Sequence, residues 1–256
     1  SQSCLSNRKI WILHESIGRD LYYFLVEFID ENMTVFIPDS EAEKSQFWYS
    51  NARLNLTLDF DKLSDFSMTN EHHEQFRALT AFEDPEVVQK IGKRINEQNY
   101  TELIFGSILH DAVNANWYKT YTLDLYYKMV KKSLVNLCGI FVTQNTTDFR
   151  LWIFIGITPP VSESRFGWLG LLYAYYVRTF LHALNDFVAE YPALKENIVL
   201  MDTVHVSQGH LSAHDYTDDT HYGKTAVSHY ANASTIVNDM AGHMVLNYLC
   251  APHTSS

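Results

Sequence analysis

Short apolar runs alternate along this chain with longer stretches of helical periodicity, and that alternation limits the folds open to it. The clearest apolar runs are residues 9–13, 103–105, 151–157 and 198–201. Between runs, apolar residues recur about every three or four positions, as at Leu21, Phe24, Leu25 and Phe28. Strands that alternate with crossover helices form a parallel sheet, so the sequence predicts an α/β fold.

The rest of the chain completes the predicted order of strands and helices. Further strands are expected at 33–37 and, with one face exposed, at 54–60; the remainder of 38–83 is predicted to be loop. The expected helices are 17–28, 85–96, 121–137, 168–188 and 228–249. Asp84 followed by Pro85 is a typical helix start. Without repeats or linkers, residues 1–256 are predicted to form a single domain.

Bulk properties exclude several classes of protein. The chain has 256 residues, 46% of them hydrophobic, enough for one packed core. Its net charge of -11 argues against nucleic acid and anionic membranes as partners. The most apolar stretch, 168–184, contains Arg178 and His182, so membrane insertion by this segment is not expected. No signal peptide is visible, which fits a cytosolic protein, a mature form or an excised domain.

Sequons and cysteines favour the secretory pathway, either extracellular or in the Golgi or ER lumen. Asn-x-Ser/Thr occurs at Asn32, Asn55, Asn99, Asn145 and Asn232, although polar loop residues would explain these positions too. Cys4 precedes the first predicted strand and Cys250 ends the last helix, places that can be adjacent in a layered α/β domain. A Cys4–Cys250 disulfide is therefore plausible in an oxidising compartment. Cys138, among apolar residues, is predicted to be a buried free thiol without chemistry.

A serine near one end and an Asp-x-x-His string near the other suggest nucleophilic catalysis. Ser16 falls at a strand-to-helix junction, where backbone N–H groups and the helix dipole favour a developing oxyanion. The simpler interpretation is a helix N-cap serine. Asp218 can orient His221, which can then take the serine proton. In an open α/β sheet, Ser16 and the loop that carries Asp218 and His221 would both lie at the carboxyl edge of the strands.

Other residues near the same edge are candidates for binding. Gly106, after a buried strand, allows close backbone approach and an oxyanion N–H, or it only ends the strand. Arg19 binds a carboxylate or fixes the adjoining loop, or it is a solvated helix residue. His110 is expected to line the same cleft. The loop before the last helix also holds His205, His210, His214, Asp215 and Asp219. Their spacing matches no compact zinc motif, so no metal site is predicted, and a metal-assisted hydrolase stays an alternative.

The pattern resembles the SGNH (GDSL-like) hydrolase superfamily, and within it the PC-esterase branch that includes the luminal domains of sialic-acid and fungal capsule O-acetyltransferases. The motif His14-Glu15-Ser16-Ile17-Gly18-Arg19 is similar to the family's Gly-Asp-Ser-x-x-Arg, and Asp218-Asp219-Thr220-His221 to its Asp-Gly-x-His. The resemblance implies a flavodoxin-like three-layer α/β/α sandwich with a mainly parallel sheet. It implies Ser16 as nucleophile, His221 as general base and Asp218 as its orienting residue.

The same resemblance implies acyl-ester chemistry on a carbohydrate or another acyl-ester substrate, by an O-acetyltransferase or an acetylesterase. No cofactor is implied beyond an acetyl donor, such as acetyl-CoA or an acylated glycan, if the protein is a transferase. Two departures stand out: His14 and Glu15 replace the family's Gly and Asp, and its oxyanion-hole Asn has no clear counterpart near Gly106. A second hypothesis is therefore a catalytically inactive glycan-binding or structural module.

Overall fold

The structure of the protein, a computed structural model, has a six-stranded sheet with helices on both faces. It describes residues 2–30, 46–63, 82, 84–106, 108, 111–112, 122–143, 149–156, 169–207 and 236–251. The strands are β1 (Lys9–His14), β2 (Gln46–Asn51), β3 (Leu56–Lys62), β4 (Glu102–Gly106), β5 (Arg150–Ile155) and β6 (Ile198–Asp202). The helices are α1 (Ser16–Ile29), α3 (Pro85–Gln98), α5 (Leu123–Thr143), α6 (Leu169–Glu190) and α7 (Ile236–Cys250), with short 3₁₀ turns η1 (Gln2–Leu5), η3 (Pro192–Asn197) and η4 (Val204–Ser207).

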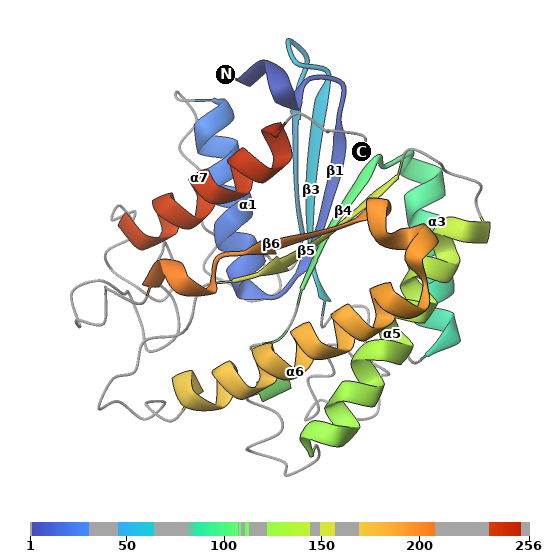
Figure 1. The fold of residues 1–256 in the computed structure, drawn as a ribbon. Coiled ribbons are helices and arrows are strands. Elements are labelled where there is room, and N and C mark those ends of the chain that lie inside the picture. The colour runs from blue at the N-terminus through green and yellow to red at the C-terminus, as the bar shows by residue number, and fades with distance from the viewer. Residues whose placement is uncertain are drawn as a thin grey trace.

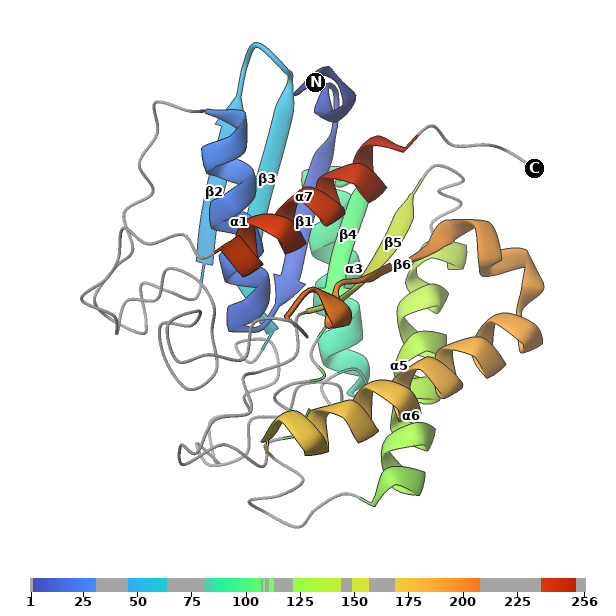
Figure 2. The ribbon, with the colours of Figure 1, turned by 60° about the vertical axis from the view of Figure 1, so that its left-hand side comes forward.

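The strand order confirms the predicted fold class. The sheet runs β2-β3-β1-β4-β5-β6, and every neighbouring pair is parallel except β2 with β3. Without β2, the parallel strands follow the flavodoxin-like order 2-1-3-4-5. Helices α1 and α7 cover one face, and α3, α5 and α6 lie on the other (Figures 1 and 2). The result is a three-layer α/β/α sandwich.

The central strands are apolar because helices bury both of their faces. All five residues from Ile10 to His14 are buried, and so is every residue of β4. Such continuous runs, rather than alternation, are typical of parallel strands inside a sandwich. The runs that stood out in the sequence therefore became β1, β4, β5 and β6, each within two residues of its predicted bounds.

One strand was missed. The segment expected to be loop contains β2, an edge strand that pairs antiparallel with β3. Phe47 stacks on Tyr22 of α1 at 5.7 Å, whereas Trp48 points away and is 75% exposed. Because three aromatic residues in a row hide the alternation, pairing with β3 rather than the local pattern defines this strand.

Helix boundaries follow their capping residues. Asp84 caps α3 as predicted, since its side chain accepts from the Glu86 N–H at 2.9 Å. The helix ends at Asn99, which has φ 53°. Helix α5 continues to Thr143, beyond the predicted end at residue 137. The strand expected at 33–37 and the predicted first turns of the last helix, 228–235, lie outside the described residues.

The two ends of the chain are joined at the amino edge of the sheet. Cys4 of η1 and Cys250 of α7 form the expected disulfide, with Cα atoms 5.2 Å apart. Beside it, the partly buried Arg8 forms an ion pair with Glu102 and donates to the Leu249 carbonyl at 2.8 Å. Trp152 Nε1 donates to the same carboxylate at 2.6 Å. These contacts fix η1, β1, β4, β5 and α7 to one another.

Three asparagines adopt left-handed backbone conformations at this same edge. Asn7, Asn55 and Asn99 have φ of 63°, 49° and 53°, and each precedes a parallel strand. Asparagine tolerates this conformation better than other residues with a Cβ, because its side chain bonds locally. Asn55 Nδ2 donates to Asn7 Oδ1 at 3.0 Å. Asn55 and Asn99, two of the predicted glycosylation sites, are exposed.

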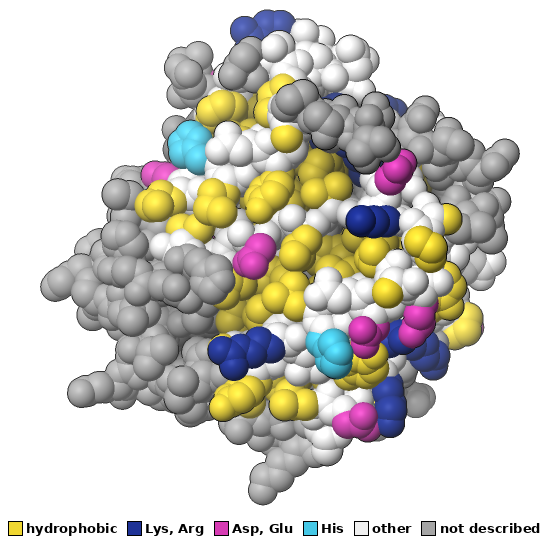
Figure 3. All heavy atoms as spheres, viewed as in Figure 1, with side chains coloured by type: hydrophobic (Ala, Val, Ile, Leu, Met, Phe, Trp, Pro, Cys, Tyr) yellow, Lys and Arg dark blue, Asp and Glu magenta, His cyan; other side chains and the backbone are white. Residues whose placement is uncertain are grey.

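The far edge of the sheet is apolar and partly open. Ile198, Val199 and Leu200 of β6 are only partly buried, and Tyr175 and Met240 on the flanking helices are exposed. Figure 3 shows apolar side chains gathered across the middle of this face, where Figure 1 has β6 between α6 and α7. Among the described residues, no helix has the length and apolar character needed to span a membrane.

Candidate functional site

The strand order makes the carboxyl ends of β1 and β4 the candidate site. From β1 the chain passes to β3 on one side, and from β3 it returns to β4 on the other side. The sheet order therefore reverses between β1 and β4, which is where open α/β sheets bind ligands. His14 ends β1 opposite Gly106, which ends β4. Ser16 follows two residues later, so Ser16 and Gly106 lie at the same edge, as predicted.

Ser16 is the first helical residue of α1. Glu15 occupies the N-cap position, with φ -81° and ψ -167°, and makes no capping hydrogen bond through its side chain. The interpretation of Ser16 as the N-cap is therefore wrong by one residue. The Glu15 carbonyl accepts from the N–H of Gly18 at 3.0 Å and of Arg19 at 3.3 Å, which closes the first turn. The positive end of the helix dipole thus lies at Ser16 and favours negative charge there.

His14 is built into the turn that leads to Ser16. The residue is buried, with 4% of its surface exposed. Nδ1 accepts a hydrogen bond from the Glu15 N–H at 2.8 Å, and Nε2 lies 3.3 Å from the Phe154 carbonyl oxygen of β5. His14 was not among the predicted site residues, and it lies four residues before Gly18 in the sequence.

Gly106 and Gly18 are small because His14 needs their space. A Cβ on Gly18 would lie 2.2 Å from His14 Cβ. A Cβ on Gly106 would lie 2.2 Å from the Phe154 carbonyl oxygen and 2.6 Å from His14 Nε2. The neighbours that approach Gly106 closely are therefore the β5 backbone and His14. Its role in an oxyanion hole stays a prediction.

Arg19 lies one turn along α1 and is buried, with 6% of its surface exposed. The interpretation as a solvated helix residue is wrong. Within the described part of the chain, neither Arg19 Nε nor the hydroxyl of Tyr23, one turn further on, has a hydrogen-bond partner. Burial raises the pKa of Tyr23, so its hydroxyl keeps its proton. Two buried donors, costly to leave unpaired, therefore follow Ser16 on one stripe of α1.

The remaining predicted site residues lie outside the described residues. These are the catalytic candidates Asp218 and His221, the binding candidate His110, and the sequons at Asn32, Asn145 and Asn232. Asp111, next to His110, is buried and accepts from the Tyr126 hydroxyl at 3.3 Å. No group of three or more metal-ligating side chains occurs within the described ranges, and most of the histidine-rich tract falls outside them.

A second buried polar group links α3 to the sheet. Asp61 accepts from Trp11 Nε1 at 2.6 Å and pairs with Arg94 of α3 at 2.6 Å. Arg94 also lies 4.9 Å above the Trp11 ring. Burial raises the pKa of Asp61 to about 6, although Arg94 and the Trp11 N–H both favour its charged form. The arrangement fixes α3 on β1 and β3, and it lies among tightly packed side chains.

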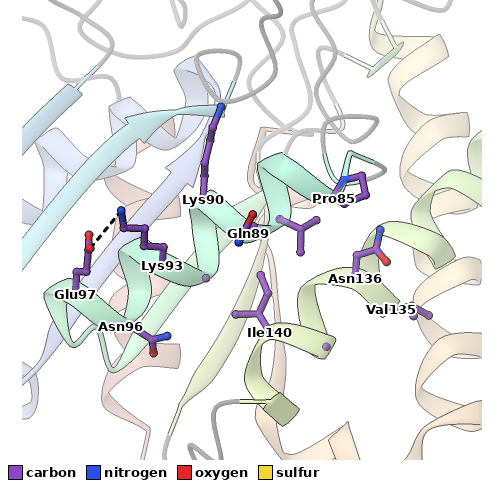
Figure 4. Close-up of a pocket in the computed structure, with 12 residues that line it drawn as sticks. Pro85, Gln89, Lys90, Lys93, Asn96, Glu97, Val135, Asn136 and Ile140 are labelled. Carbon is purple, nitrogen blue, oxygen red and sulfur yellow. Dashed lines mark ion pairs between the residues drawn. The ribbon is translucent and has the colours of Figure 1, made fainter.

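An open groove of about 1080 Å³ lies between α3 and α5 (Figure 4). Val88, Val135 and Ile140 give it apolar walls, and Lys90 and Lys93 lie along α3 beside it. The groove contains none of the predicted site residues and no Ser, Cys, His or Asp. It offers a surface for contact but no nucleophile.

The prediction of a buried free thiol at Cys138 is confirmed. Cys138 is buried and free, and burial raises the pKa of its thiol to about 12. A thiol of this kind is unreactive at neutral pH, because the thiolate is the nucleophilic form.

Comparisons with known proteins leave the family open. No protein-family model matches this chain, and no curated protein matches it. Among solved structures, it is similar to the N-terminal part of protein BF1531 from Bacteroides fragilis, which contains a phosphatase domain and was solved with Mg. That likeness has a TM-score of 0.43 and 9% sequence identity, and it covers 98% of this chain and 54% of the other. This chain thus spans about half the length of that one, and such a likeness says nothing of activity.

Proposed function

We propose that this protein carries out serine-dependent acyl-ester chemistry on a carbohydrate, as an O-acetyltransferase or an acetylesterase. Ser16 is the nucleophile, His221 takes its proton, and Asp218 orients the imidazole. The observation that carries the proposal is the position of Ser16. It begins α1 directly after β1, at the point where the strand order reverses.

The electrostatics of the turn support an acyl transfer. As Ser16 Oγ attacks an ester carbonyl, negative charge develops on the carbonyl oxygen, and the N-terminus of α1 stabilises charge of that sign. Arg19 and Tyr23 supply buried donors on the next two turns for oxygen atoms of a bound substrate. The Cys4–Cys250 disulfide supports a secretory-pathway location, where such bonds persist.

A fluorophosphonate probe tests the nucleophile directly. We expect covalent labelling at Ser16, found by peptide mass spectrometry, and its loss in Ser16→Ala. His221→Ala should slow the labelling by about 10²-fold or more, because a serine without its base is a weak nucleophile. Absence of labelling in protein with an intact fold would refute the proposal. Acetate release and acetyl transfer from acetyl-CoA or an acylated glycan then separate hydrolase from transferase.

A catalytically inactive glycan-binding module is the second candidate. The position of the His14 ring favours this candidate. The ring lies beside Gly106, in space that a glycine at position 14, the residue in the family's motif, would leave open. In that case the probe leaves Ser16 unlabelled, while glycans still raise the melting temperature of the protein.

A further inference from the structure

The contacts of His14 define which of its nitrogens carries the proton. A backbone N–H is always a donor, so the Glu15 N–H, 2.8 Å away, requires a lone pair on Nδ1. The neutral ring therefore carries its hydrogen on Nε2, which faces the Phe154 carbonyl oxygen at 3.3 Å. With both nitrogens engaged by backbone, His14 is not placed to act as a general base.

The ring also fills a site shaped for it. It lies between Gly18 of α1 and Gly106 of β4, where any Cβ would collide with it, and its centroid is 5.4 Å from that of Phe154. One side chain thus contacts the β1–α1 turn and the ends of β4 and β5. A glycine at this position, as in the family motif, could make none of these contacts.

We infer that His14 is the positioning residue of this site: its imidazole holds the turn that leads to Ser16. The inference rests on the proposed function. The hydrogen bond fixes the peptide N–H of Glu15, one residue before Ser16, and the contact with Phe154 fixes the ring against the sheet. Displacement of a reacting group by about 1 Å can lower the rate about 10²-fold.

Three substitutions separate the two hydrogen bonds. His14→Asn keeps an acceptor close to the Glu15 N–H, His14→Gln keeps a donor close to the Phe154 carbonyl, and His14→Ala keeps neither. We expect the labelling rate of Ser16 and kcat on an acetyl ester to fall about 10²-fold in the alanine variant, with KM nearly unchanged. His14→Asn should recover at least tenfold of this loss, and His14→Gln much less.

A double-mutant cycle checks the packing without any need for activity. Gly18→Ala should destabilise the protein against urea, because its methyl group meets His14 Cβ. In a His14→Gly background the same change should be clearly less destabilising. Equal effects in both backgrounds would show that the ring does not sit against Gly18, which contradicts the inference even if His14→Ala does not fold.

The outcomes distinguish this inference from the proposed function. If Ser16→Ala labels as fast as the wild type, the nucleophile is wrong. If Ser16 is labelled but the folded His14→Ala variant reacts at the wild-type rate, the positioning role is wrong. It is also wrong if His14→Gln recovers as much of the labelling rate as His14→Asn.

Discussion

Removing the Cys4–Cys250 disulfide should weaken the fold strongly, because the bond closes almost the whole chain. The two cysteines are 246 residues apart. For a loop of that length, the chain-entropy relation gives about 5.5 kcal/mol of stabilisation at 25 °C, and native disulfides measure about 2–5 kcal/mol. We therefore expect Cys4→Ser with Cys250→Ser to lower the free energy of unfolding by at least about 2 kcal/mol.

Urea unfolding followed by far-UV circular dichroism measures this loss. The m-value should also rise in the double variant, because the open unfolded chain exposes more surface than the cross-linked one. A reductant should bring the wild type to the stability of the double variant. Cys138→Ala is the matched control: it removes a buried free thiol, and its unfolding should respond to reductant as the wild type does.

The result that refutes this reasoning is specific. A loss below about 1 kcal/mol, with an unchanged m-value, would mean that the unfolded chain gains little freedom when the bond opens.

Four further tests probe ion pairs, a buried carboxyl group and a helix cap of the fold. Glu102→Gln should cost at most about 3–5 kcal/mol in urea unfolding, because it removes the counter-charge of the partly buried Arg8. Glu97→Gln, which breaks an exposed pair of 3.6 Å, should cost less than about 0.5 kcal/mol, and equal losses would contradict the role of burial. Asp61 should titrate near pH 6 when followed by ¹³C NMR. Because its pKa is raised in the folded protein, the free energy of unfolding should be highest below about pH 4 and fall by at most about 3 kcal/mol as the pH rises through 6. A titration midpoint below pH 4 would show that the ion pair with Arg94 outweighs burial. Asp84→Ala should lower stability by about 1 kcal/mol through loss of the α3 cap, and an unchanged melting temperature would show that the cap contributes little.

Most of the fold could be predicted because local pattern and tertiary context agree. The buried strands read as apolar runs since both of their faces are covered, and Asp84-Pro85 marks a helix start by its own chemistry. The edge strand β2 could not be found in this way. Its aromatic residues point to both faces, one packed on α1 and one exposed, so the local pattern carries no period.

The candidate site was predicted less completely, for a physical reason. Sequence order places Ser16 and Gly106 at one sheet edge, because both follow central strands. The contacts of His14, however, join β1 to Gly106 of β4 and to Phe154 of β5, and Phe154 lies 140 residues away in the sequence. No local spacing encodes such contacts. The burial of Arg19 likewise depends on the strands beneath α1 rather than on its neighbours in sequence.

The left-handed asparagines at the amino edge give the molecule two different ends. Asn55 and Asn99 are exposed sequon residues that precede β3 and β4, whereas Ser16 follows β1 at the opposite edge. A glycan on either asparagine would therefore extend away from Ser16. Under the proposed function, one end of the sandwich would carry attached sugar, and the opposite end would bind sugar as its substrate.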